Sequence, residues 1–324
     1  MRRLPAEWEK QKAVLLAMPH KDSDWTDVLD IVKTTYMEII KEIAKREEVW
    51  LITDEPVNIE NVKSINLPTN DTWARDFGAI TVIENGIKEY LDFVFNGWGM
   101  KFASNFDNQI NQKLYIEGIL DRKPKRVGLV LEGGSIESDG NGTILTTKEC
   151  LLEANRNPHL SFEEIEKELL NLFGAKRVLW LENGYLSGDD TDSHIDTLAR
   201  LAPNDTILYV TTDDESDEHF VALKEMEREL QAFRTLDDRP YNLIPLPMTS
   251  PIYDIDYRLP ATYANFLIIN GAVLLPIYND KNDNIAISQL QKAFPERDII
   301  PIDCNSLILQ HGSLHCITMQ FFEL

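Results

Sequence analysis

One short stretch near the middle of the chain concentrates side chains capable of acid–base chemistry. Gly188 to Asp196 holds four aspartates and a single histidine, His194, and then leads into the largely apolar run Thr197–Leu201. A solvated acidic loop needs no histidine and does not usually lead into a strand. His194 and Asp196 are two residues apart, so in an extended segment both side chains point to the same face. One base and several carboxylates at one point predict a site that handles a small cation.

Three further polar segments fall at comparable points of the chain: Asp71–Asp76, Glu132–Ser135 and the pair His315-Cys316. The His194 segment lies third of the four along the chain. The three intervals between successive segments are about one, one and two times the length of a repeated unit of about 65 residues. Residues at equivalent positions in a ring of repeats meet near its axis. We therefore expect these distant segments to converge on one site.

Five helical patterns, each followed by an apolar strand, define this unit. The helices are expected to begin near Ser23 or Thr26, Ser104, Ser161, Ser216 and Asp283. The strands after them are expected at Val49–Thr53, Val127–Leu131, Val178–Leu181, Leu243–Leu246 and Ile299–Ile302.

Hairpin-like segments follow the first four of these strands. Their turns are predicted at Asn85-Gly86, Asn141-Gly142, Asn204-Asp205 and Asn270-Gly271, and the fifth unit ends in Cys316–Phe322. A doubly wound sheet does not require a hairpin after every strand. The pattern therefore favours one α/β domain, residues 1–324, built from five helix–strand–hairpin units around a central axis.

The composition narrows the class of partner. The 324 residues are 43% hydrophobic and carry a formal net charge of -22, which disfavours both nucleic acid and anionic membranes as partners. No run approaches the roughly 18 apolar residues of a membrane span, and the run Ala13–Met18 is too short for a secretory signal. Three cysteines without metal-type spacing predict no disulfide framework, so a cytoplasmic protein is expected.

Motifs along nearly the whole chain resemble those of the agmatine deiminases, within the guanidine-modifying (pentein) superfamily. They are Leu4–Glu9, Trp73–Asp76, Asn96–Gly99, Leu131–Ile136, Leu145–Thr147, Asn155–Pro158, Asp190–Asp196, Tyr263–Phe266 and His315–Thr318. The resemblance implies a five-bladed α/β propeller that hydrolyses the guanidinium of agmatine to N-carbamoylputrescine and ammonia, in polyamine (putrescine) synthesis. It also implies a homo-oligomer that needs no cofactor and no metal.

The resemblance also implies roles for individual residues. Two carboxylates, Asp76 and Asp196, would hold the planar, permanently charged guanidinium fork. Cys316 would attack its central carbon, His194 would protonate the departing ammonia and then activate water, and Glu132 would orient His194. Cys150 and Cys304 are expected to be core residues, and His311 and His315 to be structural.

The acidic surroundings of Cys316 conflict with its expected role. Nearby carboxylates disfavour a thiolate, whereas a cationic substrate and a protonated His194 favour it. We therefore expect substrate binding to assist ionisation of the thiol.

The far end of the substrate would be read by other residues. Asp190 matches the family position expected to contact that end, and Trp73 and Trp98 are expected to pack along the methylene stem and cover the cation. Arg75 could in principle pair with the carboxylate of arginine, but a structural ion pair within its motif is the favoured interpretation.

Two departures from the family pattern put the pocket and its specificity in question. The loop Gln310–His315 is bulkier than the usual glycine-rich one, and Ser193 stands where glycine is common. Deimination of arginine within a peptide is the closest alternative activity, and a non-catalytic pentein that binds a macromolecule is a second. A metal site built from Asp189, Asp190, Asp192 and His194 is disfavoured because adjacent aspartates cannot all face one ion.

Overall fold

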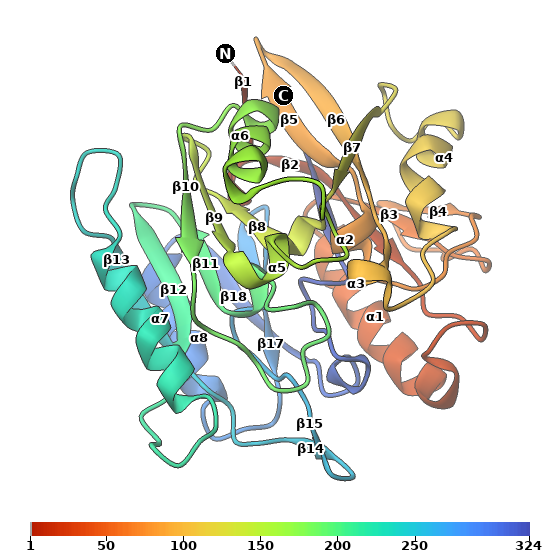
Figure 1. Ribbon diagram of the computed structural model, residues 1–324. Helices are drawn as coiled ribbons and strands as arrows, with labels where there is room; N and C mark the ends of the chain where they lie inside the picture. The colour runs from red at the N-terminus through yellow and green to blue at the C-terminus, as the bar shows by residue number, and fades with distance from the viewer. Residues whose placement is uncertain (1) are drawn as a thin grey trace.

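One strand pattern recurs in the computed structural model, which describes residues 2–324 (Figure 1). In five sheets of this part of the chain, a central strand pairs antiparallel with one neighbour and parallel with the other. A sixth sheet is the two-stranded hairpin of β14 (Tyr253–Asp254) and β15 (Tyr257–Arg258).

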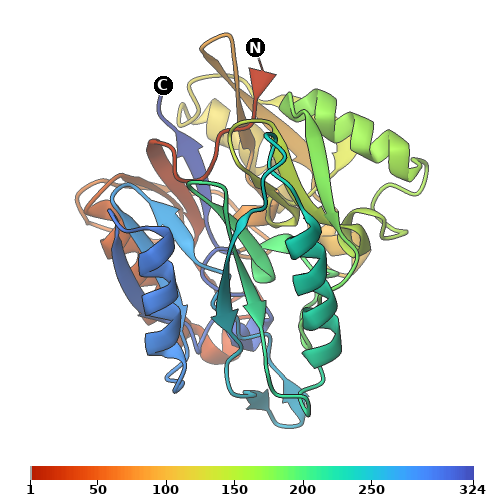
Figure 2. The same cartoon turned by 90° about the vertical axis from the view of Figure 1, so that its left-hand side faces the viewer.

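Two of the five sheets have four strands. The first has the order β19 (Met319–Phe322), β2 (Gln11–Ala17), β3 (Glu48–Ile52), β4 (Val62–Ile65). The second has the order β1 (Arg2–Arg3), β5 (Ile80–Glu84), β6 (Ile87–Val94), β7 (Lys125–Val130). Because β19 pairs with β2, the first and last parts of the chain share one sheet, and both ends lie near each other at the top of Figures 1 and 2.

The other three sheets have three strands each. They are β8 (Ile136–Ser138), β9 (Thr143–Thr147) and β10 (Arg177–Leu181); β11 (Ala199–Ala202), β12 (Thr206–Thr211) and β13 (Asn242–Pro247); and β16 (Leu267–Ile269), β17 (Ala272–Ile277) and β18 (Asp298–Asp303).

In each of the five sheets a helix joins the central strand to a parallel neighbour, the usual connection for a parallel pair, whereas a loop joins β3 to its other parallel neighbour β4. These helices are α1 (Leu29–Ala44), α4 (Ile110–Ile116), α6 (Phe162–Phe173), α7 (Phe220–Ala232) and α8 (Asp283–Ala293). They lie on the outside of the sheets in both views (Figures 1 and 2). The apolar stripe of each, such as Val32, Tyr36 and Ile40 of α1, is buried in the core.

The remaining helices are short. They are α2 (Ala74–Phe77), α3 (Gly97–Met100), α5 (Lys148–Leu151), η1 (Thr26–Val28), η2 (Asp107–Gln109), η3 (Gly133–Ser135), η4 (Ile195–Thr197) and η5 (Ile308–Gln310). None of the helices within residues 2–324 has the length and apolar character needed to cross a bilayer.

The predicted hairpin turns and the capping box of the third helix are confirmed. Asn85 and Gly86 both have positive φ (51° and 77°) between β5 and β6, as a type I′ hairpin requires. Ser161 and Glu164 form the expected capping box, and Gly174 ends α6 in the left-handed conformation with φ 60°.

The second predicted helix begins later than Ser104, and the fourth begins at Phe220, later than Ser216. The backbone N–H of Phe106 donates to the side chain of Asn70, and the Asp107 carboxylate accepts from the Asn70 backbone. These contacts tie the segment to the loop before Asp71, so regular α-helix starts only at Ile110.

Candidate active site

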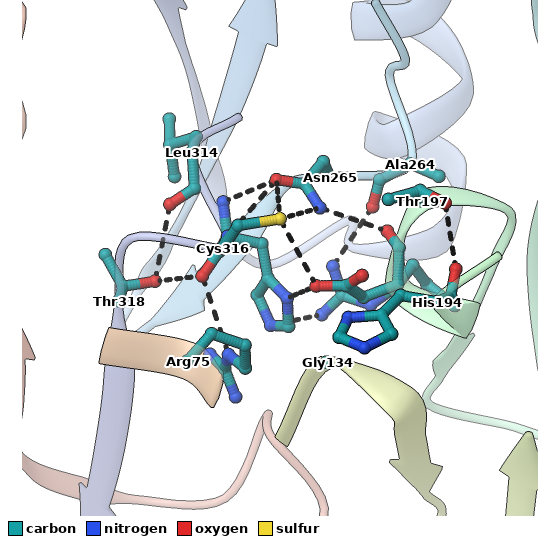
Figure 3. A network of polar contacts seen from close by, with 12 residues as sticks. Arg75, Gly134, His194, Thr197, Ala264, Asn265, Leu314, Cys316 and Thr318 are labelled. Carbon is teal, nitrogen blue, oxygen red and sulfur yellow. Dashed lines mark hydrogen bonds and ion pairs between the residues drawn. The ribbon is translucent and has the colours of Figure 1, made fainter. Parts of the chain in front are cut away.

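The nucleophile candidate Cys316 is buried in the turn before β19, where the side chain of Asn265 fixes it (Figure 3). Asn265 Nδ2 lies 3.2 Å from Cys316 Sγ. The Asn265 Oδ1 atom accepts from the backbone N–H groups of His315 at 2.9 Å and of Cys316 at 3.3 Å. One amide therefore sets both the backbone turn and the position of the sulfur.

Asp76 lies on α2 with both carboxylate oxygens engaged. Oδ1 accepts from the Gly134 backbone N–H at 3.1 Å, and Oδ2 accepts from the Trp98 indole N–H at 2.9 Å. Both contacts come from segments far along the chain, so Asp76 is held in one orientation in the buried interior.

A left-handed turn brings the Trp98 indole to Asp76. Gly97, Trp98 and Gly99 have φ values of 69°, 54° and 80°. A Cβ on Gly97 would lie 2.2 Å from the Phe102 carbonyl oxygen, so only glycine fits there. The glycines on both sides of Trp98 thus allow the backbone to aim its side chain inward.

His194 and Asp196 converge on the same space as Asp76, although they are not in the extended segment that their spacing predicted. His194 precedes η4, Asp196 lies inside it, and β11 begins only at Ala199. A Cβ at Gly134 would lie 2.6 Å from His194 Nδ1, 3.0 Å from Asp76 Oδ1 and 3.1 Å from Asp196 Oδ2. The expected convergence is therefore present, but a tight turn produces it.

The fully buried Asp196 has one oxygen engaged and one free. Oδ2 lies 2.7 Å from His315 Nδ1 and 3.8 Å from Cys316 Sγ. Within residues 2–324, Oδ1 of Asp196 has no hydrogen-bond partner, and neither has either ring nitrogen of His194. Buried polar atoms are nearly always satisfied, so these three atoms indicate where a polar ligand would bind.

Glu132 lies beside His194 but forms its ion pair with Arg156. Arg156 Nε lies 3.0 Å from both carboxylate oxygens of Glu132. Ligand atoms of Glu132, Cys150 and His194 all lie within 4.8 Å of one another. Cys150 is therefore a core residue, as expected, and also a neighbour of the candidate base.

The loop before His194 is closed by its own aspartates. The Asp189 carboxylate accepts from the N–H groups of Thr191 and Ser193, and Asp192 pairs with Arg156 at 2.7 Å. Ser193 has a φ of 62°, a conformation that glycine adopts most easily, which explains the glycine common at this position. Here the Ser193 hydroxyl donates to Glu149 at 2.9 Å.

A pocket of about 630 Å³ opens above Cys316. Its lining includes the predicted residues Trp73, Asp76, Trp98, Asp190 and Cys316, together with Asp24, Asp71, Phe102, Thr191, Gln310, His311 and Gly312. His194, Asp196 and Glu132 are not among the lining residues and are fully buried. A Cβ at Gly312 would lie 2.2 Å from the Trp73 ring, so the loop keeps glycine where an aromatic packs closely against it.

Comparison with known proteins identifies the family. The family model for Porphyromonas-type peptidyl-arginine deiminase matches residues 3–321. The chain belongs to this family.

Individual relatives are similar to this chain over nearly their whole length. The substrate-bound agmatine deiminase of C. jejuni, a cysteine-to-serine variant, is 42% identical with a TM-score of 0.95, over 100% of this chain and 97% of that one. The agmatine deiminase of Pseudomonas aeruginosa is 31% identical over 98% of this chain and 95% of its own. A dimethylarginine dimethylaminohydrolase, at 12% identity and a TM-score of 0.56 over 96% of this chain and 100% of that one, shares the fold. The chain therefore has an α/β fold that matches agmatine deiminase and pentein-type structures.

The electrostatics of this deiminase-family site follow from its buried charges. Although burial opposes the charged form, Asp76, Cys150 and Glu132 raise the pKa of His194 to about 10. Burial, with the charges of Asp196 and Glu132, raises the pKa of Asp76 to about 6. Burial, Asp196 and Asp76 raise the pKa of the Cys316 thiol well above its usual value. At neutral pH the site thus combines a protonated His194, an ionised Asp76 and a neutral thiol.

Arg75 does not form the ion pair that its motif suggested. No carboxylate in residues 2–324 lies within 4.0 Å of its guanidinium. Nε lies 3.5 Å from the His315 carbonyl oxygen and Nη1 lies 3.8 Å from Met319 sulfur. Arg75 lines a different cavity, with Glu7 and Glu137, so it is not placed to read the far end of a substrate in the Cys316 pocket.

Two buried clusters have the residue types of a metal site but already contain a cation. Arg156 pairs with Glu132 in the group Glu132, Cys150 and His194. Arg200 pairs with Glu7 and Glu137 in the group Glu7, Glu137 and His315. In this deiminase-family chain a guanidinium thus supplies the positive charge in each cluster.

Sequence reasoning missed several residues that position the site. Glu7, Arg156 and Asn265 lie in motifs of the family resemblance, but none of them, nor Arg200, is assigned a role from the sequence. For Asn265 and Arg200 the usable signal is composition, because each is polar or charged within an otherwise buried stretch, where an unpaired group would be costly. Arg156 lies in a polar loop, which gives no such signal. His315, expected to be structural, contacts Asp196 directly.

Proposed function

We propose that this protein hydrolyses the guanidinium of agmatine to N-carbamoylputrescine and ammonia. One observation carries the proposal: the pocket over Cys316 is lined by four carboxylates, those of Asp24, Asp71, Asp76 and Asp190, and by no lysine or arginine from residues 2–324. Such a pocket favours a substrate that is cationic at both ends. Agmatine has a guanidinium at one end and an amine at the other, whereas free arginine would bring a carboxylate.

The guanidinium lies between Asp76 and Asp196. The free Oδ1 of Asp196 and the carboxylate of Asp76 accept from its N–H groups, and charge-assisted pairs of this kind fix a planar fork. Trp73 and Trp98 pack along the methylene stem, and Asp190, whose side chain is 37% exposed, receives the distal amine.

The first half of the reaction breaks a carbon–nitrogen bond. The Cys316 thiolate attacks the central carbon of the guanidinium and gives a tetrahedral adduct. His194, protonated at neutral pH, donates its proton to one nitrogen, which leaves as ammonia. A covalent thiouronium on Cys316 remains.

The second half returns the enzyme to its starting state. The neutral His194 takes a proton from water as the water oxygen attacks the same carbon. The carbon–sulfur bond then breaks, the sulfur leaves as thiolate and the ureido product departs. Glu132, held by Arg156, lies close enough to His194 to orient its ring and stabilise its charge.

Substrate binding also activates the thiol. In the free protein, burial and two carboxylates hold Cys316 in its neutral form. A bound guanidinium places a positive charge beside the sulfur and lowers the cost of ionisation. The nucleophile thus forms where its target is bound. The thiol proton passes to water, and at the end of the cycle the hydroxyl proton of the ureido product returns the sulfur to its thiol form.

The proposal extends to the domain architecture, the assembly and the cellular role of the enzyme. Residues 1–324 form one catalytic domain, and the five sheets with a common strand pattern are arranged around a central axis as a five-bladed propeller. The enzyme acts as a cytoplasmic homo-oligomer in the synthesis of putrescine, without a metal or cofactor and independently of nucleic acid and membranes.

An ammonia-release assay with agmatine, free arginine and a C-terminal arginyl peptide tests the proposal. We expect turnover of agmatine, and loss of turnover in Cys316→Ala. Cys304→Ala, which removes another buried thiol outside the pocket, is the matched control. Turnover of the peptide without turnover of agmatine would favour peptidyl-arginine deimination, and ammonia release that survives Cys316→Ala would exclude the covalent mechanism.

A further inference from the structure

A buried histidine next to the nucleophile bridges two carboxylates. His315 Nδ1 lies 2.7 Å from Asp196 Oδ2, and His315 Nε2 lies 2.8 Å from Glu7 Oε2. The ring can donate to both carboxylates only as an imidazolium, in which both nitrogens carry an N–H. His315 is 1% exposed, and water does not screen these interactions.

Glu7 is itself fixed from three sides. Oε1 accepts from the Ile268 backbone N–H at 2.7 Å, and Oε2 accepts from Arg200 Nη2 at 2.7 Å as well as from His315. Arg200 Nη2 and His315 Nε2 lie 3.1 Å apart because both donate to Oε2 of Glu7. Glu7, in the segment before β2, is thus connected to Asp196 of the site through His315.

We propose that His315 is a positioning residue that holds Asp196 ionised and leaves one oxygen of it free for the guanidinium, and that Glu7 and Arg200 hold His315 in place. This inference rests on the proposed binding of a guanidinium by Asp196. It gives the N-terminal motif around Glu7 a function in substrate binding.

The division of the Asp196 carboxylate supports this role. Oδ2 is taken by His315, so the carboxylate cannot rotate, and Oδ1 is the atom without a partner. Although burial opposes ionisation of Asp196, the hydrogen bond and charge of His315, with His194 and Arg200, lower its pKa.

Other charges around His315 come from several elements. Those facing it or its partners are Glu7 before β2, Arg75 and Asp76 on α2, Glu137 on β8, His194 before η4, Asp196 on η4 and Arg200 on β11. Of these, Asp196 and Glu7 are the carboxylates bonded directly to its ring nitrogens. Removing the imidazolium therefore acts first on these two groups.

The test measures agmatine binding by titration calorimetry in a Cys316→Ser background, from mildly acidic to neutral pH. His315→Asn keeps an N–H donor toward Asp196 but cannot carry the charge. Without the imidazolium, burial is unopposed at Asp196 and raises its pKa toward the titrated range. We expect the affinity of His315→Asn relative to the background to fall about tenfold one pH unit below this raised pKa, and to recover as Asp196 ionises at higher pH. Glu7→Gln should also lower the affinity relative to the background at acidic pH.

The matched control is Asp92→Asn, because Asp92 is also a buried carboxylate and accepts hydrogen bonds from Asn111 and Gln112, outside the site. Its affinity relative to the background should stay constant with pH. If the affinity of both test variants relative to the background is unchanged, or is lowered equally at every pH, the positioning role is overturned. Failure of agmatine to bind the background protein would also overturn it. Binding with the expected relative affinities, but no ammonia release by the wild type, would sink the proposed function alone.

Discussion

His194 Nδ1 lies 3.7 Å from Asp76 Oδ1, and within residues 2–324 no hydrogen bond satisfies either ring nitrogen of His194. The carboxylate is close enough to keep the imidazole protonated, but too far away to form a hydrogen bond with it. A guanidinium nitrogen bound beside the pair would accept a proton from His194 while donating to Asp76. The acid and the substrate-binding carboxylate are thus electrostatically coupled before substrate arrives.

This coupling predicts how activity depends on pH. Because the pKa of Asp76 is raised to about 6, its carboxylate is present above that pH and is lost as the pH falls through it. We expect kcat/KM for agmatine to fall below about pH 6. Trp98→Phe removes the indole N–H that stabilises the carboxylate, so this limb should move up by about one pH unit.

Trp180→Phe is the matched control for that experiment, because its indole N–H donates to Glu166 at 2.6 Å outside the pocket. Its pH profile should match that of the wild type. An acid limb that does not move in Trp98→Phe would show that another group limits binding.

A second prediction concerns the state of the nucleophile. Since burial, Asp196 and Asp76 raise the pKa of Cys316, the free protein should carry a thiol there at neutral pH. The ultraviolet thiolate absorbance, taken as the difference between wild type and Cys316→Ser, should be small and should rise when a cationic alkylamine binds, which has no guanidinium carbon to attack. A free protein that already shows mostly thiolate would refute activation by substrate.

The sequence predicted which segments meet but not how each one turns. Asp76, His194, Asp196 and Cys316 come together as expected because hairpin, helix and strand patterns are local and periodic. The 3-10 turn at Asp196 and the left-handed turn at Trp98 depend on tertiary contacts, such as the close approach of Gly97 to Phe102. The glycines beside Trp98 were the signal for the second turn.

The network of Glu7, Arg200 and His315 could not be predicted from the sequence, for a different reason. Glu7 and His315 are 308 residues apart, and no periodicity links them. Pairing between buried charges depends on which segments the finished fold places together, so Arg200 could be recognised as unusual in its apolar strand but could not be assigned a partner. Arg75 illustrates the same limit, because local pairing within its motif was expected and did not occur.

A third prediction separates the two ends of the substrate. Asp190→Asn should raise KM for agmatine about tenfold with little change in kcat, because the distal amine is remote from the reacting carbon. KM for butylguanidine, which lacks the amine, should not change. Asp254→Asn on β14 removes an exposed carboxylate outside the pocket and serves as the control. An equal rise in KM for both substrates would mean that Asp190 shapes the pocket without reading the amine.

A fourth prediction concerns stability. Arg156 is completely buried at its side chain and pairs with Glu132 and Asp192, so Arg156→Met leaves the buried Glu132 without its hydrogen-bonded guanidinium. We expect the free energy of unfolding to fall by about 3–5 kcal/mol. Arg239→Met breaks an exposed pair with Asp205 and should cost less than about 1 kcal/mol. Urea denaturation of both variants checks the difference, and equal costs would contradict it.

The last prediction tests the space that the catalytic groups share. A methyl group at Gly134 would lie 2.6 Å from His194 Nδ1 and close to the oxygens of Asp76 and Asp196, so it would displace these groups or fill the guanidinium position. Gly134→Ala should therefore lower kcat/KM about 100-fold or more, because misplacement by about 1 Å costs that much. Gly128→Ala on β7, where a Cβ meets nothing within 4 Å, should keep wild-type kcat/KM and thermal stability. If Gly134→Ala turns over agmatine as fast as Gly128→Ala does, the guanidinium does not bind between His194, Asp76 and Asp196.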